Sequence, residues 1–157
     1  MNDLVTSSEA TARIVAAIPS LPEETVPLAD AIGRVLRVPL IADRPLPPYR
    51  RATMDGIAFR FASTTSVRIA GLHAAGDPPP RRLNEGEAWE IMTGALVPED
   101  CDTLVPYEEV TIENSLAEIS GEQAPGRFIH EVGTDAHEGQ ILVRTGSILG
   151  PGEIAIA

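Results

Sequence analysis

Short, largely apolar runs fill much of the chain from residue 54 onward, and they constrain the fold more than any other feature. The runs at 54–61, 67–70, 88–92 and 103–107 have the length and residue content of strands. The runs at 110–112 and 116–119 predict a hairpin around Asn114 and Ser115. Two further strands are predicted at 128–132 and 140–143. This pattern predicts a β-rich protein.

One amphipathic helix is predicted ahead of these strands. Thr6 and Glu9 have the spacing of a capping box, in which each side chain bonds to the main chain of the other residue. Apolar residues then recur at helical spacing from position 10 to 18, and Pro19 ends the helix. We expect this apolar stripe to be buried against another part of the protein. A strand is predicted at 35–41, where Pro39 indicates an edge or a bulge. The predicted fold class is therefore α+β, with β structure dominant.

Composition narrows the classes of function. The chain has 157 residues, which suits one domain or two small ones. Its net charge of −11 argues against binding nucleic acid or an anionic membrane over a broad surface. Cys101 is the only cysteine, so an internal disulfide is impossible, as is usual in a reducing compartment. The sequence shows no leader of signal type and no apolar run of membrane-spanning length, so we expect a cytoplasmic protein.

The familiar catalytic motifs are missing. The chain contains no G-x-S-x-G, no H-E-x-x-H and no phosphate-binding P-loop. His73, His130 and His137 are scattered, and no second pair of metal ligands accompanies them, so a histidine metal site is not expected. Cys101 lies between Asp100 and Asp102, and neighbouring carboxylates raise the pKa of a thiol. A reactive thiolate is therefore not expected either.

The remaining candidates lie where polar residues meet glycine at the ends of apolar runs. They are Asp55 before Gly56, Thr93 with Gly94, and Asp135. A tight turn explains each motif taken alone, because glycine adopts a positive φ and Asp or Thr satisfies the local backbone. Two such motifs in a small chain indicate a built site. Carboxylates suit Mg²⁺, and a Thr-Gly turn offers a hydroxyl and backbone amides to an oxyanion.

Several longer segments carry a resemblance to a known family. Residues 47–58 resemble P-P-F-D-N-S-A-M-D-G-Y-A, and residues 90–106 resemble R-I-M-T-G-A-P-x-P-x-G-A-D-A-V-V. Three more segments match family patterns. The pattern L-x-E-A-L-G-R-V-L matches residues 28–36, the end of R-x-x-G-x-D matches residues 132–135, and G-x-x-L-x-P-x-E-I matches residues 146–154. These motifs, in this order, are those of the molybdopterin molybdenumtransferase (MoeA-type) family, which includes the E domain of gephyrin. The chain resembles the N-terminal and linker region of that family.

The resemblance implies an architecture and a site. It implies an elongated discontinuous domain, residues 1–48 and 122–157, that carries an inserted β-rich domain, residues 49–121. It implies catalytic or metal-binding roles for Asp55 and Asp135, and oxyanion contact by Thr93 and Gly94. The complete enzyme would use Mg²⁺ and molybdate, take adenylylated molybdopterin as substrate and work as a homodimer. We expect none of these ligands to bind tightly to this chain alone.

Two departures from the family pattern leave an alternative open. Arg50, Arg51 and Ala52 stand where the family has Asp-Asn-Ser, which either alters the site, marks lost activity, or only places charge in solvent. The sequence ends as Pro151 begins a new predicted helix, and no pterin-binding α/β domain is present. The first expectation is a piece of the enzyme that is inactive alone. The alternative is a standalone, non-catalytic dimerisation or interaction module descended from the family.

Overall fold

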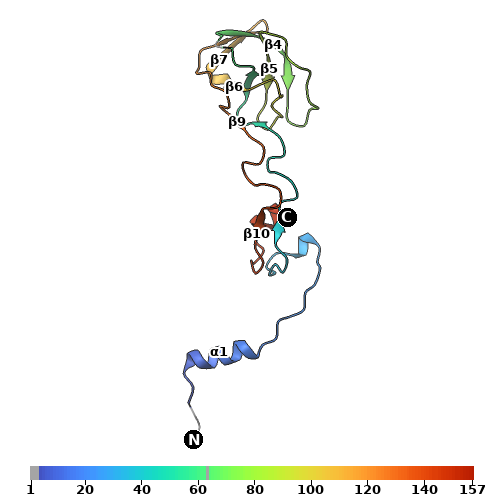
Figure 1. The fold of residues 1–157 in the computed structure, drawn as a ribbon, viewed down its shortest axis with the longest axis vertical. Coiled ribbons are helices and arrows are strands. Elements are labelled where there is room, and N and C mark those ends of the chain that lie inside the picture. Colours follow the sequence, from blue (N-terminus) through green and yellow to red (C-terminus); the bar gives the residue numbers. More distant parts are fainter. Residues whose placement is uncertain (1–3, 63) are drawn as a thin grey trace. The chain divides into compact units, whose positions relative to one another are not determined.

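Six strands form a curled sheet in the order β6-β3-β5-β4-β8-β7 (Figure 1). The structure is a computed structural model that describes residues 4–62 and 64–157. The strands are β3 (Gly56–Phe59), β4 (Ser66–His73), β5 (Glu87–Ile91), β6 (Thr103–Pro106), β7 (Val110–Glu113) and β8 (Leu116–Ile119). The predicted β-rich α+β class is confirmed.

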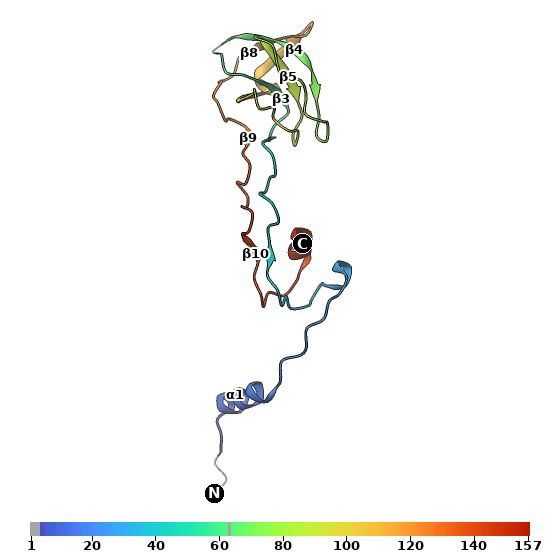
Figure 2. The same cartoon turned by 45° about the vertical axis from the view of Figure 1, so that its right-hand side comes forward.

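The strand pairing is mostly antiparallel. Strand β3 lies between β5 and β6 and is antiparallel to both, whereas β4 and β5 are parallel. Strands β7 and β8 form the predicted hairpin, with positive φ angles of 49° and 63° at Asn114 and Ser115. Because both turn residues have positive φ, their backbone twist matches that of the two strands. Figure 2 shows β3, β5, β4 and β8 side by side.

Strands β3 and β6 are buried on both faces. All four residues of β3 are buried, and successive residues belong to different clusters: Ile57 and Phe59 to one, Ala58 to the other. Strand β6 divides in the same way, with Leu104 in the cluster of Ala58 and Val105 in that of Ile57. Side chains alternate between the faces of a strand, so two apolar faces require a continuous apolar run. This explains why the sequence of these strands is not alternating.

A bulge bends β4 where it meets the only tryptophan. The register of β4 with β5 shifts between Ile69 and Gly71. Gly71 has φ of 153°, and a Cβ atom there would lie 2.9 Å from the Trp89 ring. Two independent reasons therefore require glycine at position 71: the backbone conformation, and the close packing of the indole ring. The Trp89 ring consequently reports on the interior of this sheet.

The chain divides into two compact units, Met1–Pro39 with Val143–Ala157, and Leu40–Leu142. The second unit holds the six-stranded sheet. It also contains β2 (Arg51–Ala52), which pairs with β9 (Ile129–His130), and β1 (Leu40–Ile41), which pairs with β10 (Ile141–Val143). The β10 bounds extend one residue beyond that unit. The domain boundaries implied by the resemblance remain a prediction.

The first unit contains α1 (Ser7–Ala17), η1 (Leu28–Asp30) and α2 (Pro151–Ile156). The predicted capping box is confirmed: the Thr6 hydroxyl accepts from the Glu9 amide, and Glu9 accepts from the Thr6 amide at 2.8 Å. The expected burial of the helix is not seen, since no residue of α1 is buried and Ile14 is 61% exposed.

The strand predicted at 35–41 is wrong over most of its length. Only Leu40–Ile41 is a strand, and Val35 makes a single bridge to Ile148. Pro39 has no N–H to donate, so a continuous ladder cannot pass through it. The strands predicted at 128–132 and 140–143 shorten to β9 and β10. Within residues 4–62 and 64–157, none of the helices has the length and apolar character that a bilayer crossing requires.

Candidate functional site

Asp55 and Thr93 meet at one end of the sheet. Asp55 immediately precedes β3, and Thr93 follows β5 by two residues. Because Gly56 pairs with Ile91 across these antiparallel strands, the start of β3 and the end of β5 lie together. The Thr93 amide and the Thr93 hydroxyl each donate to Asp55 Oδ1 at 2.6 Å. The tertiary structure thus joins two of the residues that the sequence analysis singled out.

These contacts stabilise Asp55 as a carboxylate. The Thr93 hydroxyl and then the Thr93 amide lower the pKa of Asp55, because both donors favour its ionised form. The Asp55 main chain is held as well, since its carbonyl accepts from the Tyr107 amide at 3.1 Å. Both Asp55 and Thr93 are exposed. The result is an oriented, ionised and accessible carboxylate, with its other oxygen, Oδ2, receiving no hydrogen bond from the described residues.

The backbone donors predicted for an oxyanion have acceptors within the protein. The Thr93 amide is bonded to Asp55, and the Gly94 amide donates to the Ala52 carbonyl at 2.8 Å. Gly94 has φ of 85°, which is the backbone conformation that glycine adopts without strain. The Gly94 carbonyl accepts from the Tyr49 hydroxyl at 3.3 Å. In this state Thr93 and Gly94 build the turn that orients Asp55, and their amides are not directed at a ligand.

Two neighbouring residues of this site were missed in the sequence. The Tyr107 hydroxyl donates to Glu90 Oε1 at 2.5 Å, and Tyr107 also bonds to the Asp55 carbonyl. Burial, the bond to Glu90 and the charges of Glu90 and Asp55 raise the pKa of Tyr107, so its phenol stays protonated. Glu90 stands where the resembling family segment begins with arginine. This departure was the one sequence feature that could have indicated a role for Glu90. Its partner Tyr107 could not be identified without the strand pairing of the sheet.

Asp135 belongs to a different group of contacts. Its carboxylate lies 3.3 Å from His130 Nε2 and 3.7 Å from Arg51 Nη2. Arg51 also contacts His130 Nδ1 through Nε at 3.2 Å, and the two residues face each other in the pairing of β2 with β9. The polar contacts of the Asp135 side chain do not include Asp55 or Thr93. The structure therefore shows two groups, Asp55 with Thr93, and Asp135 with Arg51 and His130.

Arg50 and Arg51, which depart from the family pattern, both contact other side chains or main-chain groups of the protein. Arg50 contacts Glu131 Oε1 at 3.2 Å and donates to the Cys101 carbonyl at 3.2 Å. Arg51 lies against His130 and Asp135. The sequence left open that Arg50 and Arg51 only place charge in solvent. Their contacts exclude that interpretation. Arg51 places positive charge directly beside a predicted site carboxylate.

The donor groups fit Mg²⁺ at one position better than at the other. Mg²⁺ is commonly held by one or two carboxylates together with substrate phosphates and water. Asp55 fits this mode, because it is ionised and one of its oxygens is unused. Asp135 fits it poorly, because the Arg51 guanidinium repels a cation. Over residues 4–62 and 64–157, no three His, Cys, Asp or Glu side chains gather in a metal-binding cluster.

The chain is similar to one family of known proteins. A family model described as MoeA N-terminal region (domain I and II) matches residues 5–157. A curated molybdopterin molybdenumtransferase from Synechocystis sp. is 34% identical over 137 residues, which cover 83% of this chain and 35% of that protein. Molybdopterin molybdenumtransferase 2 from Mycobacterium tuberculosis is 32% identical over 141 residues, which cover 85% of this chain and 35% of that protein.

The structural comparison agrees with the sequence comparison. A crystal structure of the molybdopterin biosynthesis moeA protein from Pyrococcus horikoshii superposes with a TM-score of 0.89 at 28% identity. The match covers 98% of this chain and 43% of that one. The chain spans about a third of the length of the curated relatives it matches.

Proposed function

Because the chain belongs to the family of the MoeA N-terminal region, we propose that it supplies the N-terminal part of a molybdopterin molybdenumtransferase. The proposed reaction inserts molybdenum from molybdate into adenylylated molybdopterin, in the cytoplasm and in a homodimer. The observation that carries this proposal is the Asp55–Thr93 pair, which occupies the two motifs that resemble the family. The chain spans about a third of the length of the curated relatives it matches, so the proposed activity is that of a longer polypeptide.

Asp55 is proposed to act on the phosphate end of the substrate. A magnesium ion bound there would neutralise phosphate charge and favour cleavage of the adenylyl linkage. Asp55 would hold that ion through its free oxygen, and Thr93 would keep the carboxylate ionised and directed. The proposed role of Thr93 is thus positioning, since its amide and hydroxyl are bonded to Asp55. A direct contact of Thr93 or Gly94 with an oxyanion would require these bonds to be exchanged.

Asp135 is proposed to position the Arg51 side chain. Its carboxylate lies beside Arg51 and His130, and the Arg51 guanidinium is suited to an oxyanion such as molybdate or phosphate. An Asp135 carboxylate in contact with Arg51 orients the guanidinium while leaving its other N–H groups available. This role is consistent with the arginine that departs from the family motif, and it does not require Asp135 to bind a metal.

The test uses the longest polypeptide encoded in frame with this chain. Asp55→Asn should abolish molybdenum insertion into adenylylated molybdopterin and lower the unfolding midpoint only slightly, because the amide oxygen can still accept from Thr93. The control is Asp43→Asn, which removes an exposed carboxylate whose ion pair is with the adjacent Arg44. The proposal fails if Asp55→Asn and Asp43→Asn retain equal activity.

The alternative of a non-catalytic interaction module makes the opposite prediction. It is favoured by the exposed apolar stripe of α1 and by Arg51 beside Asp135. A module of this kind would dimerise as a folded protein, and no in-frame product containing it would restore molybdoenzyme activity in a deficient strain. Restoration of activity by such a product would eliminate this alternative.

A further inference from the structure

A cavity of about 390 Å³ lies in the unit Leu40–Leu142, and none of the proposed functional residues lines it. Sites for small molecules have volumes in this range and combine apolar walls with a few placed polar groups. The apolar wall consists of Pro79, Pro80, Leu96, Val97, Pro98 and Val132. The polar groups on its lining include two arginines, Arg50 and Arg82.

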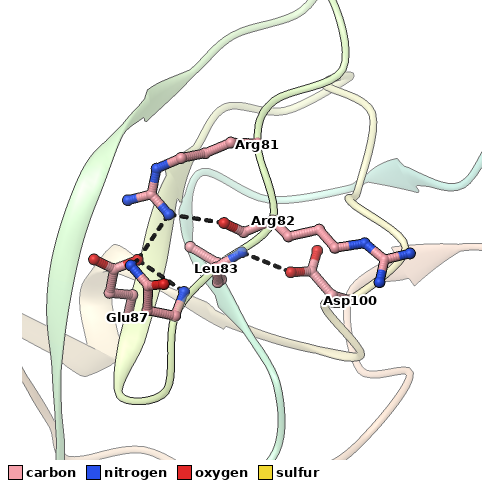
Figure 3. A network of polar contacts seen from close by, with 6 residues as sticks. Arg81, Arg82, Leu83, Glu87 and Asp100 are labelled. Carbon is pink, nitrogen blue, oxygen red and sulfur yellow. Dashed lines mark hydrogen bonds and ion pairs between the residues drawn. The ribbon is translucent and has the colours of Figure 1, made fainter.

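The backbone that carries Arg82 is anchored on both sides. Before it, Arg81 Nη1 contacts Glu87 Oε2 at 2.8 Å and the Arg82 carbonyl at 2.7 Å. After it, the Leu83 amide donates to Asp100 Oδ2 at 2.7 Å. Figure 3 shows this network, with the Arg82 side chain extending away from Glu87, on the side where Asp100 lies. Arg82 is therefore presented to the cavity by a fixed segment.

The two arginines of the cavity differ in what they contact. Arg50 is occupied by Glu131 and by the Cys101 carbonyl. The ion pairs formed within the described part of the chain do not include Arg82, and its guanidinium makes no hydrogen bond there. A guanidinium is a planar fork that matches carboxylate and phosphate oxygens. Arg82 is thus the group of this cavity that remains available to an anion.

The acidic residues on the lining limit the charge of the ligand. Asp100 and Glu99 both contribute to the wall. Asp100 is held by the Leu83 amide, whereas Glu99 is exposed. With two arginines and two acids, the lining has no net positive charge, so it offers no net attraction to a polyanion. A single anionic group on an apolar body matches both the available guanidinium and the proline and aliphatic wall.

We propose that this cavity binds a small organic anion, with Arg82 contacting its carboxylate or phosphate and the apolar wall contacting its body. This site goes beyond the proposed function and does not depend on it. The Arg82 guanidinium forms no ion pair or hydrogen bond within residues 4–62 and 64–157, so its replacement should leave the network of Arg81, Glu87 and Asp100 in place. The proposal can be tested on this chain with simple probes.

The experiment titrates the chain with phenyl phosphate and with benzoate, followed by calorimetry and by amide NMR shifts. Inorganic phosphate and phenol serve as probes that lack the apolar body or the charge. We expect saturable binding of at least one organic anion, tighter than that of inorganic phosphate and of phenol, with NMR shifts around residues 79–83 and 96–100. Arg82→Gln should weaken this binding about tenfold, whereas Arg82→Lys should retain part of it.

The matched control is Arg60→Gln, because Arg60 is exposed, makes no ion pair among the described residues and does not line the cavity. It removes the same charge and should leave the affinity within about twofold. Three results would each overturn the proposal. They are an equal loss in Arg82→Gln and Arg60→Gln, an organic anion that binds no tighter than inorganic phosphate, and no saturable binding of either organic anion.

Discussion

Thr93 donates twice to a single oxygen of Asp55, through its amide and its hydroxyl, each at 2.6 Å. The two strands that carry these residues to the same end of the sheet are β3 and β5. Both bonds favour the ionised carboxylate, so the pair has a measurable effect on the pKa of Asp55.

Thr93→Val should raise the pKa of Asp55 towards its ordinary value. Valine has a similar shape but no hydroxyl, so the largest of the influences that lower this pKa is lost while the amide bond remains. The measurement is a pH titration of the Asp55 carboxyl carbon by NMR. Thr111→Val, at an exposed position of β7, should leave the titration unchanged. An unshifted Asp55 titration in Thr93→Val would contradict the assignment.

Gly56→Ala should destabilise the sheet by about 3 kcal/mol or more. A Cβ atom at Gly56 would overlap the Val105 carbonyl and lie 2.7 Å from Pro106 Cα, and both are main-chain atoms of the paired strand β6. Chemical denaturation followed by Trp89 fluorescence measures this loss. Gly152→Ala is the control, because nothing lies within 4 Å of a Cβ atom there. Equal stability of the two variants would show that the strands can separate without penalty.

Tyr107→Phe should lower the free energy of unfolding by about 1–2 kcal/mol, because a half-buried Glu90 loses its donor. The chain has one other tyrosine, Tyr49, which is exposed and makes a longer bond of 3.3 Å to Gly94. Tyr49→Phe should therefore cost less. Urea unfolding of both variants provides the comparison, and a larger loss in Tyr49→Phe would refute the importance of the Glu90–Tyr107 bond.

The Arg81–Glu87 contact should make stability fall in acid. Arg81 first, and then the Asn84 main chain and side chain, lower the pKa of Glu87 from 4.5 to about 2. A carboxylate with a lowered pKa in the folded state stabilises the protein above its unfolded pKa, and this contribution disappears as pH falls from 4.5 towards 2. Arg81→Gln should weaken the dependence of the unfolding midpoint on pH between 4.5 and about 2. An identical pH dependence in wild type and Arg81→Gln would show that the Arg81–Glu87 contact does not cause the loss of stability in acid.

Cys101 should react with thiol reagents only when the protein unfolds. Burial, and then the charges of Asp100 and Asp102, raise the pKa of the Cys101 thiol to about 12. Because the thiolate is the reactive form, modification at about pH 8 should be slow in the native protein and fast in denaturant. Rapid stoichiometric labelling of the native chain would contradict this environment.

The sequence motifs located much of the fold and part of the site. The hairpin at Asn114–Ser115, the capping box of Thr6 and Glu9, and most sheet strands were predictable because each depends on residues close in the chain. The ends of strands were less predictable, since pairing decides them, as the shortened strand near Pro39 shows. The exposure of α1 was not predictable, because an apolar stripe indicates a need for burial but does not identify what covers it.

The residues alone determined the family, the β-rich class and the candidate side chains, because ordered motifs and turn chemistry are properties of the linear chain. Only the tertiary structure decided that Asp55 joins Thr93 while Asp135 joins Arg51 and His130, and that Glu90 meets Tyr107. The physical reason is register: the pairing of Gly56 with Ile91 and of Arg51 with His130 sets which distant side chains meet, and no local interaction encodes those pairings.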